Sequence, residues 1–484
     1  MTHRRVILHG ASAGSEGADA DPAGLRAAFD AIRVEFDIPA QFPEAVLAQA
    51  AQAAASPPHP DRDETGLDFF TIDPPGSMDL DQAMALERDG AGYRVRYAIA
   101  DVPGFVAPDG AIAAEAWQRV ETLYLPDGRS PLHPPALSED AASLLPDVDR
   151  PAYVWDLRLD EAGEVTAAEV YRALVRSRAR LDYGGVQADI DAGRATEALA
   201  LLAEIGPKRM ALEIARGGAS LPMPEQEIVL GDDGHYALRY RPPLPAEDWN
   251  AQISLMTGMA AAAMMLQGKV GILRTMPDPD PKGIAAFRRL VEALGVPWPR
   301  EQSYGAFLQG LDPATPQHLA IIHEATSLFR GAGYTAFDGS LPELSTHAAV
   351  AAPYAHVTAP LRRLVDRFGL AACAALSAGE PVPDWVTHAL PELPDRMREG
   401  DQRASAVTRA CTDAAESAEL TGRVGEEFDA IVVDDRGDKG TLVALAEPAI
   451  LAPCTGHAEP GTSIRVRLTT ADVATRTVAF AVAT

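Results

Sequence analysis

The sequence predicts an α+β protein in three parts: a short helical module over residues 1–60, a large mixed region over 61–420 and a small all-β barrel over 421–484. Apolar residues recur at helical spacing near the start, and strand and helix patterns are mixed through the middle. The last sixty residues carry strand patterns with tight Asp/Gly turns and almost no helix signal. A chain of 484 residues is also too long for one ordinary core.

The first part contains two stretches typical of helices. DPAGLRAAFDAIRVEF (21–36) places apolar residues from Leu25 to Phe36 at helical spacing, with Asp21 and Pro22 as start signals. FPEAVLAQAAQAAA (42–55) is a second predicted helix. It ends before SPPHPDRDE, whose prolines and charges indicate a linker.

The central part mixes strands and helices. GYRVRYAIADV (92–102) alternates Tyr93, Val95, Tyr97 and Ile99 on one face, which predicts a strand, and 152–175 predicts two strands around the turn EAG. The apolar stretch MTGMAAAAMML (256–266) is too short to cross a bilayer and predicts a buried helix. Further helices are expected over 193–216, 283–294, 317–330, 360–377 and 401–420.

The last part predicts four or five short strands. A five-stranded barrel is the natural arrangement for so short a β segment, and the OB-fold is its commonest form.

Composition limits the function. The net charge of −27 argues against binding polyanions by bulk electrostatics. It leaves room for a narrow basic channel, or for an acidic site that a metal neutralises. Cys373, Cys411 and Cys454 have no metal-ligand spacing. With no signal-peptide pattern at the N-terminus, we expect a soluble, cytoplasmic monomer without membrane contact.

One acidic turn is the main candidate for chemistry. TIDPPGSMDLDQA (71–83) places Asp73, Asp79 and Asp81 within nine positions, and two prolines and a glycine between them reverse the chain. Three carboxylates at one point suit Mg²⁺ or Mn²⁺. On residue type alone, a solvated acidic loop is the alternative.

The neighbouring sequence blocks favour a metal site over a solvated loop, because they resemble the catalytic RNB domain of the ribonuclease II family. The turn matches the signature T-I-D-x5-D-x-D-D-A, and matching blocks cover roughly residues 64–420. They include AIADV, TLYLPDG, SRARLDYGGV and YAHVTAPLRRLVDR. The resemblance implies metal-dependent, hydrolytic 3′-to-5′ degradation of single-stranded RNA to nucleoside 5′-monophosphates. It also implies a C-terminal RNA-binding OB domain.

The resemblance also implies residue roles. Asp73, Asp79 and Asp81 match metal ligands, and catalysis depends most on Asp81. Tyr124 matches a tyrosine that positions the 3′-terminal nucleotide, and Arg362 matches an arginine that grips the phosphate. The RNA-binding candidates are Tyr124, Tyr183, Arg178, Arg180, Arg362 and Arg363. Arg363 has a surface charge as its alternative, and the run Arg172, Arg176, Arg178 and Arg180 is either a phosphate-contacting wall or a solvated face.

Several positions depart from the pattern. Gln82 stands where a fourth carboxylate is expected; its carbonyl can still ligate a metal, so Gln82→Asp is expected to strengthen metal binding. Leu221 replaces a base-stacking aromatic, and Ser254 replaces an acidic residue that contacts the same nucleotide.

These departures leave an alternative function: an RNA-binding protein on a degenerate, catalytically weak or inactive RNB fold. The three aspartates favour activity. The N-terminal cold-shock barrels of larger members are also replaced by the helical module, as a nucleic-acid contact or, as we favour, a cap on the core.

Overall fold

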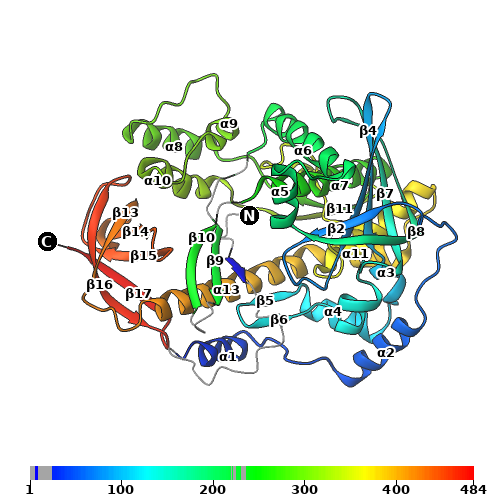
Figure 1. Ribbon diagram of the computed structural model, residues 1–484, viewed down its shortest axis with the longest axis horizontal. Helices are drawn as coiled ribbons and strands as arrows, with labels where there is room; N and C mark the ends of the chain where they lie inside the picture. Colours follow the sequence, from blue (N-terminus) through cyan, green and yellow to red (C-terminus); the bar gives the residue numbers. More distant parts are fainter. Residues whose placement is uncertain are drawn as a thin grey trace.

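The computed structural model describes residues 6–8, 24–219, 221, 225–230, 236–241 and 243–483. A closed five-stranded barrel lies on the right in Figure 1, and we call it the central barrel because its strands come from the central part of the sequence. Antiparallel pairing joins neighbouring strands around it, except where the first strand meets the last in parallel. The strands, in barrel order, are β2 (Phe69–Asp73), β3 (Gln82–Asp89), β4 (Gly92–Ala100), β7 (Asp149–Leu159) and β8 (Val165–Asp182). The strands predicted at 92–102 and 152–175 are therefore confirmed.

The period-two pattern of β4 explains how this barrel is buried on both sides. Tyr93, Val95, Tyr97 and Ile99 face a core that includes residues of the covering helices, so they point outward from the barrel. The alternate residues, such as Ala98, pack with Phe69 of β2 and with alanine and valine residues of β3, β7 and β8, so the barrel interior is filled mostly by small side chains.

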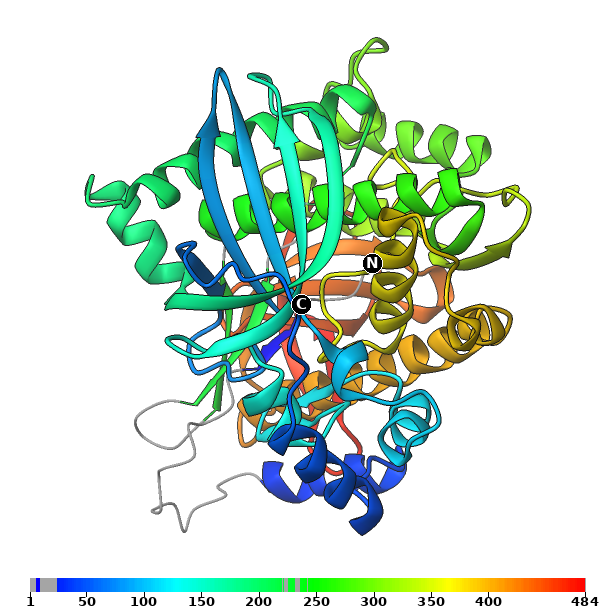
Figure 2. The same cartoon turned by 90° about the vertical axis from the view of Figure 1, so that its right-hand side faces the viewer.

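Long helices cover the barrel and connect it to the rest of the molecule. Figure 2 shows its long strands beside the green helices, which include α6 and α7. The helices after the N-terminal pair are α3 (Val102–Phe105), α4 (Ala111–Arg119), α5 (Tyr183–Asp191), α6 (Glu197–Arg216), α7 (Pro245–Gly268), α8 (Pro281–Ala293), α9 (Tyr304–Gln309), α10 (Pro316–Ala325), α11 (Leu364–Ala378), α12 (Asp384–Ala389) and α13 (Leu393–Glu419). The predicted helix at 256–266 is the buried second half of α7, with Met256, Ala261 and Met265 in the main core.

A second closed barrel forms the C-terminal part. Its strands, in barrel order, are β13 (Glu427–Asp435), β14 (Thr441–Leu445), β15 (Ile450–Thr455), β17 (Thr477–Val482) and β16 (Ser463–Asp472). Phe428 and Phe480 lie in its core, with their ring centroids 5.8 Å apart. The prediction of a five-stranded, OB-type barrel is confirmed.

The predicted N-terminal helices are α1 (Leu25–Glu35) and α2 (Glu44–Ala55). Phe29 of α1 packs against α13 and the short strand β5 (Leu123–Leu125), while α2 packs on α4. The predicted start signals Asp21 and Pro22 lie outside the described residues. Both helices thus cover the central region, as a cap would.

One small sheet was not predicted. β1 (Val6–Leu8) pairs in parallel with β9 (Glu225–Leu230), which pairs with β10 (Tyr236–Arg241). Two further pairs are β5 with β6 (Gly128–Ser130) and β11 (Val270–Thr275) with β12 (Gly333–Asp338). Across the described ranges, no helix is both long and apolar enough to span a membrane.

The packing of α1 gives a first prediction. Phe29 is fully buried between α1 and α13, so Phe29→Ala should destabilise the fold by about 3–5 kcal/mol, the usual loss for a buried phenylalanine. Thermal unfolding followed by circular dichroism should show a clearly lower Tm. Val34→Ala on the same helix, where the side chain is 78% exposed, is the matched control and should leave the Tm unchanged. Equal Tm values for the two variants would contradict the described packing.

Candidate active site

The acidic turn connects β2 to β3 and is pinned to a neighbouring segment of chain. The backbone N–H of Leu80 donates to Ser143 Oγ (3.0 Å), and the same hydroxyl donates to the carbonyl of Met78 (2.6 Å). Leu144 N–H donates to the carbonyl of Leu80 (3.0 Å). Because both neighbours of Asp79 are held through their backbone, its position and that of Asp81 are fixed by the fold.

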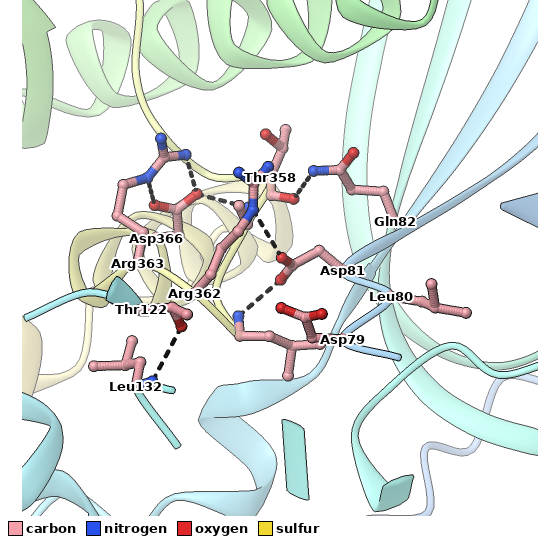
Figure 3. A network of polar contacts seen from close by, with 12 residues as sticks. Asp79, Leu80, Asp81, Gln82, Thr122, Leu132, Thr358, Arg362, Arg363 and Asp366 are labelled. Carbon is pink, nitrogen blue, oxygen red and sulfur yellow. Dashed lines mark hydrogen bonds and ion pairs between the residues drawn. The ribbon is translucent and has the colours of Figure 1, made fainter. Parts of the chain in front are cut away.

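Asp81 is the most buried carboxylate of the turn, at 3% exposure. Its Oδ1 accepts the backbone N–H of Leu361 (2.7 Å), and its Oδ2 accepts Nε–H of Arg362 (3.2 Å), as Figure 3 shows. Burial raises the pKa of Asp81 to about 8, because desolvation outweighs the stabilising effect of Arg362 and the Leu361 N–H.

Asp79 and Asp73 share this neighbourhood. Asp79 accepts the hydroxyl of Tyr124 (3.1 Å) and a guanidinium N–H of Arg129 (2.7 Å). Burial raises the pKa of Asp73 to about 6; Arg362 opposes that rise and the charge of Asp79 adds to it. Within the described structure, Asp73 Oδ2 is buried and accepts no hydrogen bond.

Arg362 and Arg363 are adjacent in the sequence but have different partners. The side chain of Arg363 is 19% exposed and pairs with the fully buried Asp366, which also accepts the N–H of Ala359 (2.8 Å). Arg363 therefore fixes the loop before α11, and the alternative of a free surface charge does not hold. The side chain of Arg362 is 49% exposed, so it can contact a substrate while it pairs with Asp81.

Tyr124 faces the same space from β5. It is 41% exposed, one of the few large apolar side chains left open to solvent, and its hydroxyl is held by Asp79. We call residues 358–363, before α11, the arginine loop. Thr122, the residue before β5, donates its N–H to the carbonyl of Arg362 (3.0 Å) and so connects β5 to this loop. Tyr124, Asp79, Asp81 and Arg362 thus come together from three separate segments of sequence.

Gln82 is held in contacts outside the carboxylate group. Its Oε1 accepts the hydroxyl of Tyr97 (2.8 Å), and its Nε2 donates to the carbonyl of Thr358 (2.5 Å). Figure 3 shows its amide directed to Thr358 rather than to Asp79 or Asp81. The carbonyl that a metal would use already has a partner, and Gln82 links β3 to the start of the arginine loop.

The other RNA-binding candidates lie at different distances from this centre. Arg180 donates to the carbonyl of Ser77 (3.3 Å) and so reaches the acidic turn, while Arg178 donates to the carbonyl of Thr65. Tyr183 accepts an N–H of Asn250 (3.1 Å), and the charge of Asp73 contributes to its raised pKa, behind burial.

Other positions noted in the sequence have structural partners. Arg172 and Arg176 pair with Asp101 and Asp149, so that part of the run is neutralised. Ser254 hydrogen-bonds Thr358 (2.8 Å). Leu221 packs against the core around α8–α10.

Sequence reasoning missed Arg129, Asp366 and Thr358. All three lie in or beside blocks that carry the family resemblance: Arg129 follows the block of Tyr124, and the other two flank Arg362. The signal was proximity to a matched block, but residue type alone did not show that Asp366 is a buried ion-pair partner.

The carboxylates fit a hard divalent cation in their chemistry. Three Asp side chains on one turn supply only oxygen ligands, Asp73 Oδ2 is a buried acceptor without a donor, and burial raises two of the pKa values. In the described ranges no three His, Cys, Asp or Glu side chains are already grouped closely enough to hold a metal. Arginines neutralise Asp79 and Asp81 instead.

Comparisons with known proteins identify the family of the chain. The chain matches the RNB domain over residues 62–368 and the RNase II-type exonuclease C-terminal S1 domain over 426–483. It is 26% identical to Ribonuclease R of Aquifex aeolicus over 84% of its own length and 60% of that protein's length. The chain therefore spans less than two thirds of this relative.

The fold is shared with solved structures. Mycoplasma genitalium RNase R, solved in complex with ribose methylated single-stranded RNA, has a TM-score of 0.84 at 18% identity, over 95% of this chain and 78% of that one. Yeast Ssd1, described as a pseudonuclease, has a TM-score of 0.64 at 15% identity, over 93% and 56%. Because the RNB match alone covers more than half of the sequence, the chain belongs to the RNB-domain family, with an RNase II-type S1 domain at its C-terminal end.

Proposed function

We propose that this protein is a metal-dependent, hydrolytic 3′-to-5′ exoribonuclease that degrades single-stranded RNA to nucleoside 5′-monophosphates. The observation that carries the proposal is the pair Asp81–Arg362 beside Tyr124. A buried carboxylate of the acidic turn, a half-exposed guanidinium and an exposed aromatic ring share one hydrogen-bonded neighbourhood. The carboxylate and the guanidinium suit phosphodiester hydrolysis, and the ring suits a stacked nucleotide base.

The chain's own residues divide the work. Arg362 holds its Nε on Asp81 and leaves the rest of its guanidinium for a phosphate, where it stabilises negative charge that develops during hydrolysis. Tyr124, oriented by Asp79, offers its ring as a surface for the 3′-terminal nucleotide. Asp73, Asp79 and Asp81 would hold Mg²⁺ or Mn²⁺, which supplies charge neutralisation at the phosphate and a lower pKa for the attacking water.

The alternative is an RNA-binding protein on a degenerate, catalytically weak or inactive RNB fold. Gln82, Leu221 and Ser254 support it, because each replaces a group expected at the metal or the terminal nucleotide. We favour activity, since all three aspartates are present and Arg362 contacts Asp81. In a protein without a metal role, such buried carboxylates are costly to keep.

A degradation assay separates the two. With 5′-labelled single-stranded RNA and Mg²⁺ or Mn²⁺, the protein should give a ladder of products shortened from the 3′ end. Asp81→Asn should lower the rate by about two orders of magnitude or more, while RNA binding is retained. Asp89→Asn at the exposed far end of β3, the strand that follows the acidic turn, is the matched control and should stay active. Full binding without any ladder in the unmodified protein would favour the alternative.

Metal affinity should depend on pH. Carboxylates with pKa values raised to about 6 (Asp73) and about 8 (Asp81) are partly protonated at neutral pH and must lose those protons to bind a cation. The Kd for Mn²⁺ should therefore fall as the pH rises from 6 to 8, and calorimetry in buffers of different ionisation enthalpy should detect proton release. Asp81→Asn should flatten the upper part of this dependence. A Kd independent of pH would show that the metal binds elsewhere.

Variants of Gln82 distinguish a role in positioning the arginine loop from a role as a metal ligand. Gln82→Ala removes its bonds to Tyr97 and Thr358, so kcat should fall by about tenfold or more as the Arg362 loop shifts. The metal concentration for half-maximal activity should stay the same; a clear rise would make Gln82 a ligand. Gln82→Asp is one methylene shorter and should also lose both bonds, so the tighter metal binding expected from its charge should come with a lower kcat.

A further inference from the structure

A second candidate binding site lies at helix α8, the loop that joins it to α9 and the start of α9, and none of its lining residues belongs to the acidic turn. An open hollow of about 470 Å³ is lined there by Arg288, Trp298, Arg300 and Tyr304, together with Asp278 and Glu301 among others. This volume lies within the range of roughly 300–1,000 Å³ that small-molecule sites occupy. We refer to it as the α8–α9 site.

A rigid stack forms one wall of the α8–α9 site. The ring of Trp298 lies parallel to that of the buried Phe307, with centroids 4.6 Å apart and an angle of 14° between the planes. The guanidinium carbon of Arg288 lies 3.7 Å from the Trp298 centroid. Trp298 Nε1 donates to the carbonyl of Gln302 (3.1 Å), which fixes the indole. The stack therefore ends in a flat guanidinium on the solvent side.

Two arginines and two carboxylates line the α8–α9 site. Among the described residues, neither Arg288 nor Arg300 has an ion-pair partner. On the C-terminal barrel, by contrast, Arg465 and Arg467 are both paired with Glu427. Arginines left without carboxylates are available to an anionic ligand. Asp278 and Glu301 can accept hydrogen bonds from the amino or hydroxyl groups of the same ligand.

The position of the site connects it with the C-terminal barrel. Helix α10, which follows α9, packs against β13, and Leu319 of α10 contacts a cluster of barrel residues. Figure 1 shows α8, α9 and α10 next to that barrel, on the side of the molecule away from the β4 and β7 end of the central barrel. The helices beside the α8–α9 site are therefore neighbours of the C-terminal barrel.

We propose that the α8–α9 site binds one nucleotide of a single-stranded RNA upstream of the 3′ end. The base stacks on the outer face of the Arg288 guanidinium, and Arg300 contacts a phosphate. Base stacking on guanidinium planes and aromatic rings is a common mode of single-strand recognition, and it tolerates any base. The inference rests on the proposal that RNA is the substrate.

The test compares RNA affinity in paired variants. Arg288→Gln with Arg300→Gln should raise the Kd for long single-stranded RNA by about fivefold or more, from the lost stacking and phosphate contacts. Arg289→Gln with Arg330→Gln removes the same charge from exposed positions that do not line the hollow, and should change the Kd by less than about twofold. The difference in Kd between the two double variants should disappear as the RNA is shortened, because a short RNA occupies only the site at the acidic turn.

A second measurement reports on the stack itself. RNA binding should change the tryptophan fluorescence of the unmodified protein, and Trp298→Phe, which keeps an aromatic ring against Phe307, should remove most of that change. Equal affinities of both double variants for every RNA length would overturn the inference, even where RNA is degraded normally. Length-dependent loss in a protein that binds RNA without degrading it would support the α8–α9 site and contradict the proposed function.

Discussion

The site depends on one buried carboxylate. Asp81 lies on the turn after β2, yet its two oxygens accept hydrogen bonds from Leu361 and Arg362, more than 270 residues later. A buried charge needs partners, so the β2–β3 turn and the loop before α11 stabilise each other. The raised pKa of Asp81 shows that Arg362 and one backbone N–H offset this burial only in part. The same residue therefore holds the site together and stays receptive to a further positive charge.

Neighbouring contacts reinforce this link. Asp366 holds Arg363 and the N–H of Ala359, and Gln82 binds the carbonyl of Thr358, so both ends of the arginine loop are fixed. Gln82 therefore lacks the negative charge that the family pattern has at this position, and instead connects β3 to the arginine loop by a hydrogen bond. Fewer carboxylates lower the repulsion around Asp73, Asp79 and Asp81, at the expense of attraction for a cation.

The spacing of apolar residues and of turn residues in the sequence predicted much of the fold. Period-two alternation in β4, helical spacing in α1 and the turn-rich C-terminal segment each predicted the element found there. The small sheet of β1, β9 and β10 was missed, because a three-residue strand has too little periodicity and its partner lies far along the chain. For the site, residue types and matched blocks located Asp81, Tyr124 and Arg362. The partners Asp366 and Arg129, and the contacts of Gln82, depend on tertiary proximity that spacing alone does not encode.

The central claim is that the acidic turn and the arginine loop form one cation-binding catalytic centre. Crystals of the protein grown with Mn²⁺ and measured near the manganese absorption edge test it most directly. The account predicts an anomalous peak for a Mn²⁺ ion that is bound by carboxylate oxygens of Asp73, Asp79 and Asp81. Gln82 should keep its hydrogen bonds to Tyr97 and Thr358. At saturating Mn²⁺, a well-ordered turn with no peak at these aspartates, or a peak held by other residues, would contradict it.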